Sequence, residues 1–168
     1  MSDSRKIAVK SLQNIIQNKV FLSEIKDNFG DNAGFLNMLL LTALRHLTYI
    51  KKIIKKYSDK KIPNKFAFTE YAIILAVTEI LYLDTPDYAA INSYVDLAKK
   101  ENNKFIGGFA NAILRKVAGN KEQHIKEDKG ELFSDEFIKI LRTDYDNKTI
   151  KEIEKAALIE PALDLSVK

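Results

Sequence analysis

The chain has 168 residues, of which 46% are apolar and 30% charged, as expected for a globular protein with a sizeable core. It contains no cysteine, which excludes disulfides, thiolate zinc sites and cysteine nucleophiles. The net charge of +4 is uneven: residues 1–120 hold 18 Lys/Arg and 11 Asp/Glu, giving +7, whereas residues 121–168 hold 9 and 12, giving −3. The basic part predicts an anionic partner.

No membrane segment or signal peptide is expected. The longest apolar run, around residues 35–44, is too short to cross a bilayer, and the first residues lack an apolar signal region. We therefore expect a cytoplasmic protein with no membrane partner. The two histidines, His46 and His124, lie far apart and show no metal-ligand spacing, so no metal site is expected.

Helical periodicity dominates the first half of the chain. Apolar residues at three- and four-residue spacing predict helices over residues 4–18, 20–29, 33–57 and 66–83. The last of these is apolar over much of its surface, which predicts a buried central helix. Pro63 and Asn64 separate it from the long helix before it.

Two further helices follow, over residues 87–100 and 105–117, joined by a polar turn at residues 101–104. Thr85 is the expected cap and Pro86 the first helical residue. Gly107 and Gly108 are unusual so near a helix start. They allow either a close approach of backbone to a ligand or close packing of two helices.

The region after residue 120 has a weaker pattern. Residues 121–130 read as a linker or a fraying helix, a short helix is expected after Ser134, and another over residues 149–158 with Ile150, Ile153, Ala156 and Ala157 inward. From residue 163 onward apolar and polar residues alternate as in a strand. We therefore expect a helical domain at 1–120 and, at 121–168, an extension that leads toward a further, sheet-containing domain.

Two basic clusters are candidate RNA-contacting sites. Arg5, Lys6 and Lys10 lie near a helix start, where the macrodipole disfavours cations, so an anionic partner is expected there. The second cluster combines one helix face, Lys51, Lys52, Lys55 and Lys56, with Lys60, Lys61 and Lys65 beyond it. This cluster is either a ridge that follows RNA phosphates or a solvated helix end stabilised by its dipole.

Other polar residues are expected to support the fold. Asn92 and Asn111 are expected to cap helices or form hydrogen bonds between helices. Arg45 is expected to pair with Glu79 in a buried or half-buried ion pair. The aromatic residues Tyr82 and Tyr88 could stack on RNA bases or pack in the core.

An ordered series of motifs identifies a family resemblance over residues 5–117. The series is Arg5 with Ala8, Leu44-Arg45, Glu79-Ile80-Leu81-Tyr82 before Pro86, Ala90-Ile91-Asn92 followed by Val95 and Leu97-Ala98-Lys99, and Phe109 to Arg115. It resembles the NusB fold, an all-α, RNA-binding bundle of about six to nine helices. The chain departs from this family where Thr42-Ala43 replace a glycine and Ile74 replaces an arginine.

Within that fold the chain is most similar to the N-terminal domain of RsmB (Sun/Fmu) ribosomal RNA cytosine-5 methyltransferases. Arg115 stands where antitermination factors of the NusB type carry Asp, and the segment 160–165 resembles the approach to a methyltransferase domain. The resemblance implies RNA contacts for Arg5 and Lys6 at the first helix. It implies a place near the RNA for Arg115 and Lys116, whose alternative role is to complement the helix dipole.

The implied function is to position small-subunit ribosomal RNA for a downstream methyltransferase domain that binds S-adenosylmethionine. That catalytic domain and its cysteines are absent from these residues, so this chain alone is expected to be inactive. One alternative is an antitermination factor that binds leader RNA with a ribosomal protein. Another is a bundle that packs on its own catalytic domain and barely contacts RNA.

Overall fold

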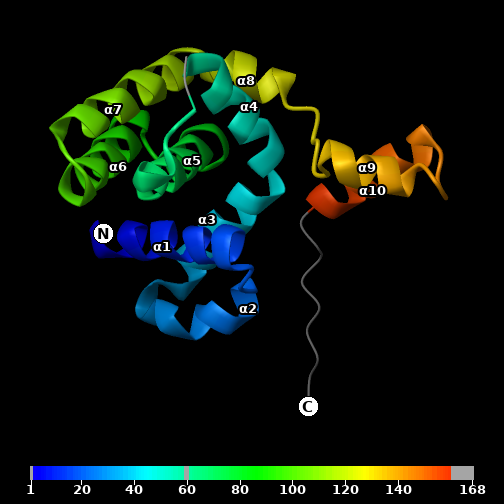
Figure 1. Cartoon of the computed structure of the whole chain (residues 1–168), viewed down its shortest axis with the longest axis horizontal. Helices are drawn as coiled ribbons and strands as arrows, with labels where there is room; N and C mark the ends of the chain where they lie inside the picture. The colour runs from blue at the N-terminus through cyan, green and yellow to red at the C-terminus, as the bar shows by residue number, and fades with distance from the viewer. Residues whose placement is uncertain (1, 59–60, 160–168) are drawn as a thin grey trace.

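The structure is a computed structural model that describes residues 2–58 and 61–159, and these ranges contain helices and no strand (Figure 1). The all-α expectation is confirmed. The elements are α1 (Ser2–Asn18), α2 (Leu22–Ile25), the 3-10 helix η1 (Lys26–Asn32), α3 (Ala33–Arg45), α4 (Leu47–Tyr57), the 3-10 helix η2 (Asn64–Phe66), α5 (Ala67–Tyr82), α6 (Asp87–Glu101), α7 (Lys104–Gly119), α8 (Lys121–Glu127), α9 (Asp135–Leu141) and α10 (Asn147–Leu158).

Helix α5 forms the centre of the molecule. Every residue from Tyr71 to Leu81 is buried, as its all-round apolar sequence predicts. Helices α1, α3, α4, α6, α7 and α8 pack around it. Ile73, Ile74 and Leu75 are fully buried, and each such side chain contributes roughly 1.5–3 kcal/mol to folding.

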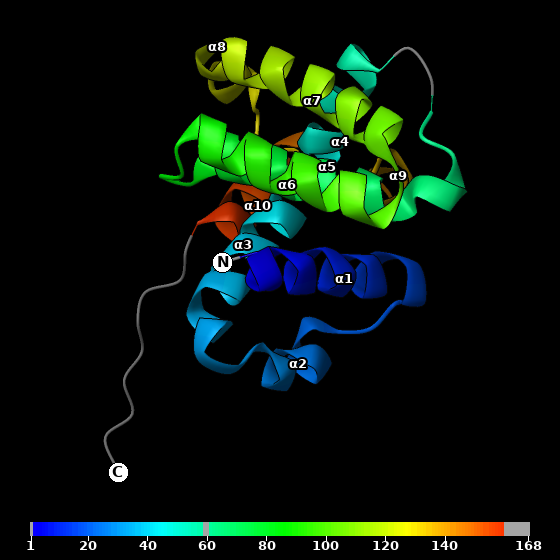
Figure 2. The ribbon, with the colours of Figure 1, turned by 90° about the vertical axis from the view of Figure 1, so that its left-hand side faces the viewer.

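Helices α1, α6 and α7 lie side by side on one face of the bundle, with α4 behind them (Figure 2). Helices α6 and α7 form an antiparallel pair, and Asn103 caps α7 by accepting a hydrogen bond from the Ile106 N–H at 3.0 Å. A Cβ atom at Gly107 would lie 2.2 Å from Lys99 Cγ, whereas one at Gly108 would meet nothing within 4 Å. Close helix packing therefore explains Gly107 without a ligand.

The long helix expected over residues 33–57 is wrong, because α3 and α4 are separate helices. His46 leaves helical geometry between them, with φ −102° and ψ 10°. Its ring stacks on Tyr82 at a centroid distance of 3.9 Å, a tertiary contact that local periodicity does not reveal. The helix expected over residues 20–29 is likewise divided into α2 and η1, and Gly30 adopts a positive φ of 52° within η1.

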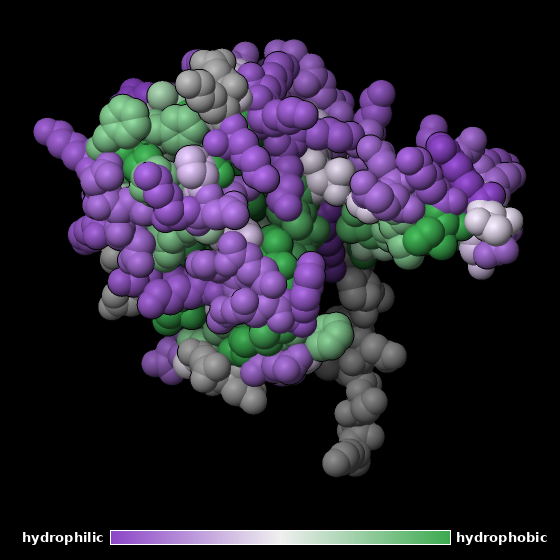
Figure 3. Space-filling view, viewed as in Figure 1, coloured by the Kyte–Doolittle hydropathy of each residue, from purple (hydrophilic) through white to green (hydrophobic). Residues whose placement is uncertain are grey.

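Helix α8 belongs to the bundle, which corrects the expectation of a linker or fraying extension. It packs on α5 and α7 and buries His124. Helices α9 and α10 then form an arm that projects from the bundle (Figure 1). Figure 3 shows a hollow between this arm and the bundle.

Side-chain caps begin both helices of the arm. Helix α9 starts after Ser134 as expected. The Ser134 hydroxyl accepts from the Phe137 N–H, and Asp146 accepts from the Thr149 N–H. The inward face of α10 is formed by Ile150 and Glu154, and the Glu154 carboxylate accepts hydrogen bonds from two backbone N–H groups of the preceding loop. The expectation that Ile153, Ala156 and Ala157 point inward is wrong, since all three are exposed. The strand pattern at residues 163–167 lies outside the described residues.

Candidate nucleic-acid interface

Arg5 is a buried structural residue, which contradicts its expected contact with RNA. Its Nε and Nη2 atoms donate to the two carboxylate oxygens of Glu79 at 2.9 and 2.7 Å, and the Tyr94 hydroxyl donates to the same carboxylate at 2.7 Å. Only 9% of the Arg5 side chain and none of the Glu79 side chain is exposed. The hydrogen bonds from Arg5 to Glu79 raise the pKa of Arg5 although burial opposes this.

The expected pair between Arg45 and Glu79 is therefore wrong, because Arg5 already occupies both oxygens of Glu79. Arg45 lies half-buried in the last turn of α3 instead. Antiparallel packing of α1 on α5 brings Arg5 and Glu79 together across 74 residues of chain. No local pattern in the sequence specifies such a pairing.

The two motif asparagines do not form hydrogen bonds between helices. Asn92 is exposed on α6, and its side chain has no hydrogen bond to another residue in the ranges 2–58 and 61–159. Asn111 accepts a hydrogen bond from Arg115 Nε at 3.2 Å within α7. In these ranges neither side chain caps a helix or joins two helices. Pro86 does start α6, although at the N-cap, and its carbonyl accepts from the N–H groups of two residues in the first turn.

We call the exposed sides of the three helices in Figure 2 the α1–α6–α7 face. Exposed basic residues on these helices are Lys6, Lys10, Lys99, Lys100, Lys104, Arg115 and Lys116. Among the residues that the structure describes, only two of their ammonium groups lie near carboxylates, Lys6 at 3.8 Å from Glu101 and Lys99 at 3.3 Å from Asp96. Two aromatic side chains are also exposed here, Tyr88 by 72% and Phe105 by 81%. Exposed cations together with exposed aromatic rings suit single-stranded RNA.

Helix α4 carries the second basic cluster, as its pattern predicts. Ile50, Ile53 and Ile54 are buried, and the four lysines on the opposite side, Lys51, Lys52, Lys55 and Lys56, are exposed. We call these four the α4 ridge. Lys52 pairs with Glu131, and Lys56 lies 4.0 Å from Glu127. Lys51 and Lys55 have no ion pair to any residue that the structure describes.

The remaining lysines of this cluster differ in their surroundings. Lys61 is exposed, and the Lys65 ammonium lies 5.0 Å from the centre of the Phe66 ring. Lys60 lies outside the described residues. Helix α4 lies behind α1, α6 and α7 in Figure 2, and its four lysines are on the side of α4 away from its buried isoleucines, so the α4 ridge lies on the opposite side of the bundle from the α1–α6–α7 face. The idea of one continuous basic side is therefore wrong.

A polar cluster that the sequence did not reveal fixes α8 to the bundle. Asp128 Oδ2 lies 2.7 Å from His46 Nδ1 and accepts from the Tyr82 hydroxyl at 2.6 Å, while Asp128 Oδ1 accepts from the Gly130 N–H at 2.9 Å. Burial opposes ionisation of Asp128, but the hydrogen bonds from His46, Tyr82 and Gly130 outweigh it and lower the pKa of this carboxyl. The Tyr82 hydroxyl is bonded to Asp128 and its ring is stacked on His46, so the ring is not available for stacking on an RNA base.

Helix α4 also binds α8 through two tyrosines. The Tyr49 hydroxyl donates to the His124 carbonyl at 2.9 Å, and the Tyr57 hydroxyl lies 2.9 Å from His124 Nε2. Burial, followed by the nearby Lys56 charge, lowers the pKa of His124. Burial raises the pKa of Tyr49 to about 12, and the acidic Glu127 and Asp128 add to this. His124 therefore acts as a neutral packing residue.

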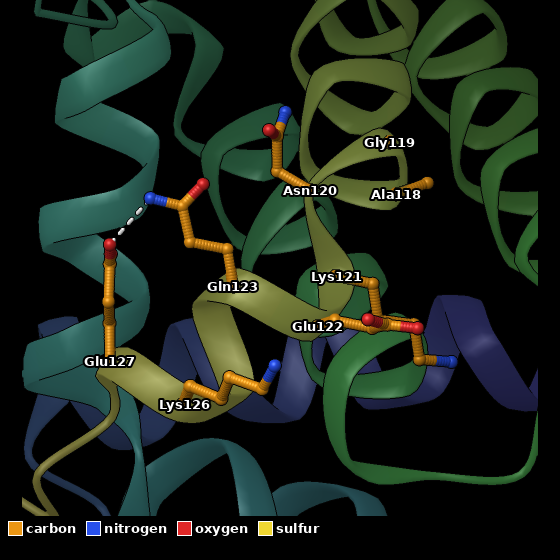
Figure 4. Close-up of a pocket in the computed structure, with 8 residues that line it drawn as sticks. All are labelled: Ala118, Gly119, Asn120, Lys121, Glu122, Gln123, Lys126 and Glu127. Carbon is orange, nitrogen blue, oxygen red and sulfur yellow. Dashed lines mark hydrogen bonds between the residues drawn. The ribbon is translucent and has the colours of Figure 1, made fainter.

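The junction of α7 and α8 is hollowed, and Figure 4 shows its lining. Gln123 donates to Glu127 at 2.6 Å there, and Lys121 lies 3.3 Å from Asp87. The lining carries two lysines and two glutamates, so it does not favour an anion. In the described ranges no three His, Asp or Glu side chains gather in a way that could hold a metal ion. No helix there is long and apolar enough to cross a membrane.

The geometry defines the class of protein as an all-helical bundle built around one buried helix, with basic residues on two opposite sides. Comparison with known families then gives the particular family. The sequence matches the NusB family over residues 2–119, and the chain belongs to that family. The match ends at the last residue of α7, so α8, α9 and α10 lie beyond it.

Similar proteins carry two different names. The chain is 35% identical over 99 residues to the transcription antitermination protein NusB of Thermodesulfovibrio yellowstonii, a match that covers 58% of this chain and 66% of that protein. It is 27% identical over 120 residues to the protein of the same name from Thermoanaerobacter sp. strain X514, covering 67% and 86%. It is 28% identical over 116 residues to ribosomal RNA small subunit methyltransferase B of Proteus mirabilis, covering 66% of this chain but 28% of that protein.

The family expectation is thus confirmed. Of the three proteins compared above, two are named for transcription antitermination and one is named as a methyltransferase. These names favour the alternative function over the leading one.

Proposed function

We propose that this chain is an RNA-binding protein of the NusB family that docks RNA on its α1–α6–α7 face. The observation that carries the proposal is the family match over residues 2–119. The charge of that part of the chain agrees with it, since residues 1–120 carry +7. Lys6, Lys10 and Arg115 would contact phosphates, and Tyr88 and Phe105 would stack on bases.

Such a surface positions RNA and does not modify it. Exposed lysines neutralise phosphates and release counterions, which gives affinity that depends on salt. Stacking on exposed rings adds affinity with little dependence on base identity. Arg5 contributes indirectly, because its pair with Glu79 holds α1 against α5 and so sets the direction of Lys6 and Lys10.

The first candidate role is transcription antitermination on leader RNA, together with a ribosomal protein. The names of the similar proteins from Thermodesulfovibrio and Thermoanaerobacter favour it. In this role the bundle acts as an adaptor between RNA and protein.

The second candidate role is to hold small-subunit ribosomal RNA for a methyltransferase domain. The similarity to the Proteus protein and helix α8, which lies beyond residue 119 and which Asp128 fixes to the bundle, favour it. The catalytic step and S-adenosylmethionine binding would then belong to a downstream domain, because this chain offers no cysteine nucleophile.

Salt-dependent RNA binding tests the proposal. Fluorescence anisotropy with a labelled single strand should give a linear fall of log affinity with log salt. The double variant Lys6→Gln/Lys10→Gln should reduce that slope by about 1.4, at about 0.7 for each phosphate contact with single strands. The control Lys139→Gln/Lys148→Gln removes two exposed charges from the arm and should leave the slope unchanged.

Undetectable binding at low salt, or binding without a salt slope, would reject RNA docking and leave the protein-interaction bundle. The choice of RNA separates the two candidate roles. Preference for a leader sequence supports antitermination, whereas preference for a helix of small-subunit ribosomal RNA supports the methyltransferase role.

A further inference from the structure

Helix α4 stands between two hollows of different charge. The hollow on the arm side is lined by Lys51, Lys52, Lys55 and Lys151 and by four carboxylates, so its charges balance. Lys51 and Lys55 also line the hollow on the bundle side, where the described residues add Lys61 and one carboxylate, Glu70. We call this second site the α4 hollow. Its excess of cations distinguishes it from the other two hollows described above.

The ion pairs of the ridge leave the cations of the α4 hollow available. Lys52 and Lys56 point to acidic residues near α8, Glu131 and Glu127. Lys51 and Lys55 have no such pair among the described residues, and they lie four residues apart on the helix, about 6 Å along the axis. Like charges at this spacing repel each other, and an anion between them relieves that repulsion.

The floor of the α4 hollow is apolar and buried. Ile54 and Ile62 line it, and each is 7% exposed. Helix α4, which carries Lys51 and Lys55, is held to α8 by the contacts of Tyr49 and Tyr57 with His124. These two lysines therefore extend from a helix that is packed on the bundle.

We propose that the α4 hollow binds phosphodiester groups of RNA and forms a second RNA contact, on the side opposite the α1–α6–α7 face. This inference rests on the proposed function. It means that one chain contacts two segments of RNA, or one RNA that passes around the bundle. The lysines provide point charges without an enclosing set of backbone donors or arginines, which suits a polymer held by repeated contacts better than a small anion.

Stoichiometry with a short oligonucleotide tests the second contact. An RNA too short to pass around the bundle should bind at two molecules per chain in isothermal titration calorimetry. The double variant Lys51→Gln/Lys55→Gln should bind one. The control Lys139→Gln/Lys148→Gln should still bind two. An unchanged stoichiometry in Lys51→Gln/Lys55→Gln, or an equal loss in the control, would overturn the inference.

Longer RNA gives a second readout. Its salt slope should fall by about 1.4 in Lys51→Gln/Lys55→Gln, and the loss should add to that of Lys6→Gln/Lys10→Gln. Sodium phosphate at matched ionic strength should compete no better than potassium chloride, and stronger competition would assign the hollow to a small anion instead. Absence of all RNA binding by the unsubstituted chain rejects both proposals, whereas binding that only Lys6→Gln/Lys10→Gln weakens rejects the α4 hollow alone.

Discussion

Replacing Glu79 with Gln should lower the free energy of unfolding of this protein more than a change to any surface charge does. The substitution keeps the shape but leaves the Arg5 guanidinium in a site where 9% of its side chain is exposed, without a counter-charge. Breaking a buried pair on one side costs about 3–5 kcal/mol. We expect the lower end, about 3 kcal/mol, because the amide oxygen still accepts one hydrogen bond. That is a large part of the 5–15 kcal/mol that stabilises a typical domain.

Urea unfolding followed by far-UV circular dichroism measures this effect. The control is Glu131→Gln, which breaks the exposed pair with Lys52 and should cost at most about 1 kcal/mol. The double variant Arg5→Met/Glu79→Leu removes both charges and should be more stable than Glu79→Gln. If Glu79→Gln and Glu131→Gln cost the same, the reasoning about the buried pair is refuted.

Three further changes test other contacts. Gly107→Ala should lower the free energy of unfolding by about 1–3 kcal/mol, because the new Cβ atom meets Lys99. Gly108→Ala meets nothing and should stabilise α7 by about 0.5–1 kcal/mol. Equal effects of the two variants in urea unfolding would contradict the close packing at Gly107. The pKa of Asp128 is lowered in the folded state, so its carboxylate stabilises the fold above the unfolded-state pKa of about 3.9, and this stabilisation is lost as pH falls through the folded-state pKa. Asp128→Asn should therefore reduce the loss of stability between neutral and acidic pH. An unchanged loss of stability in acid would exclude this carboxyl as its source. Glu70→Gln removes the carboxylate of the α4 hollow and should strengthen RNA binding about two- to five-fold by anisotropy, and weaker binding would count against that site.

Local periodicity predicted the parts of the fold that depend on local spacing. It located the buried helix α5, the α6–α7 pair and the lysine side of α4, because each of these features depends on residues spaced three and four positions apart in the sequence. It could not find the break at His46, since Asp128, its partner, lies 82 residues away. The same holds for Tyr49, Tyr57 and His124, whose contacts exist only once α8 has docked.

Arg5 shows how a sound local argument can point to the wrong partner. A cation near a helix start interacts unfavourably with the helix dipole, and an interaction with a negative charge must compensate for that cost. The sequence suggested an external phosphate, but the offset is the internal carboxylate of Glu79. Lys6, one residue further along, is exposed and keeps the predicted RNA role. The direction of each side chain around α1 decides between the two, and that direction depends on how α1 packs.

The distance in sequence between Arg5 and Glu79 also has a consequence for synthesis. Arg5 leaves the ribosome 74 residues before its carboxylate partner, a delay of about 4–15 s at ordinary elongation rates. During that time the first helix cannot bury its apolar stripe against α5, which does not yet exist. A translational pause before codon 79 would prolong that exposure.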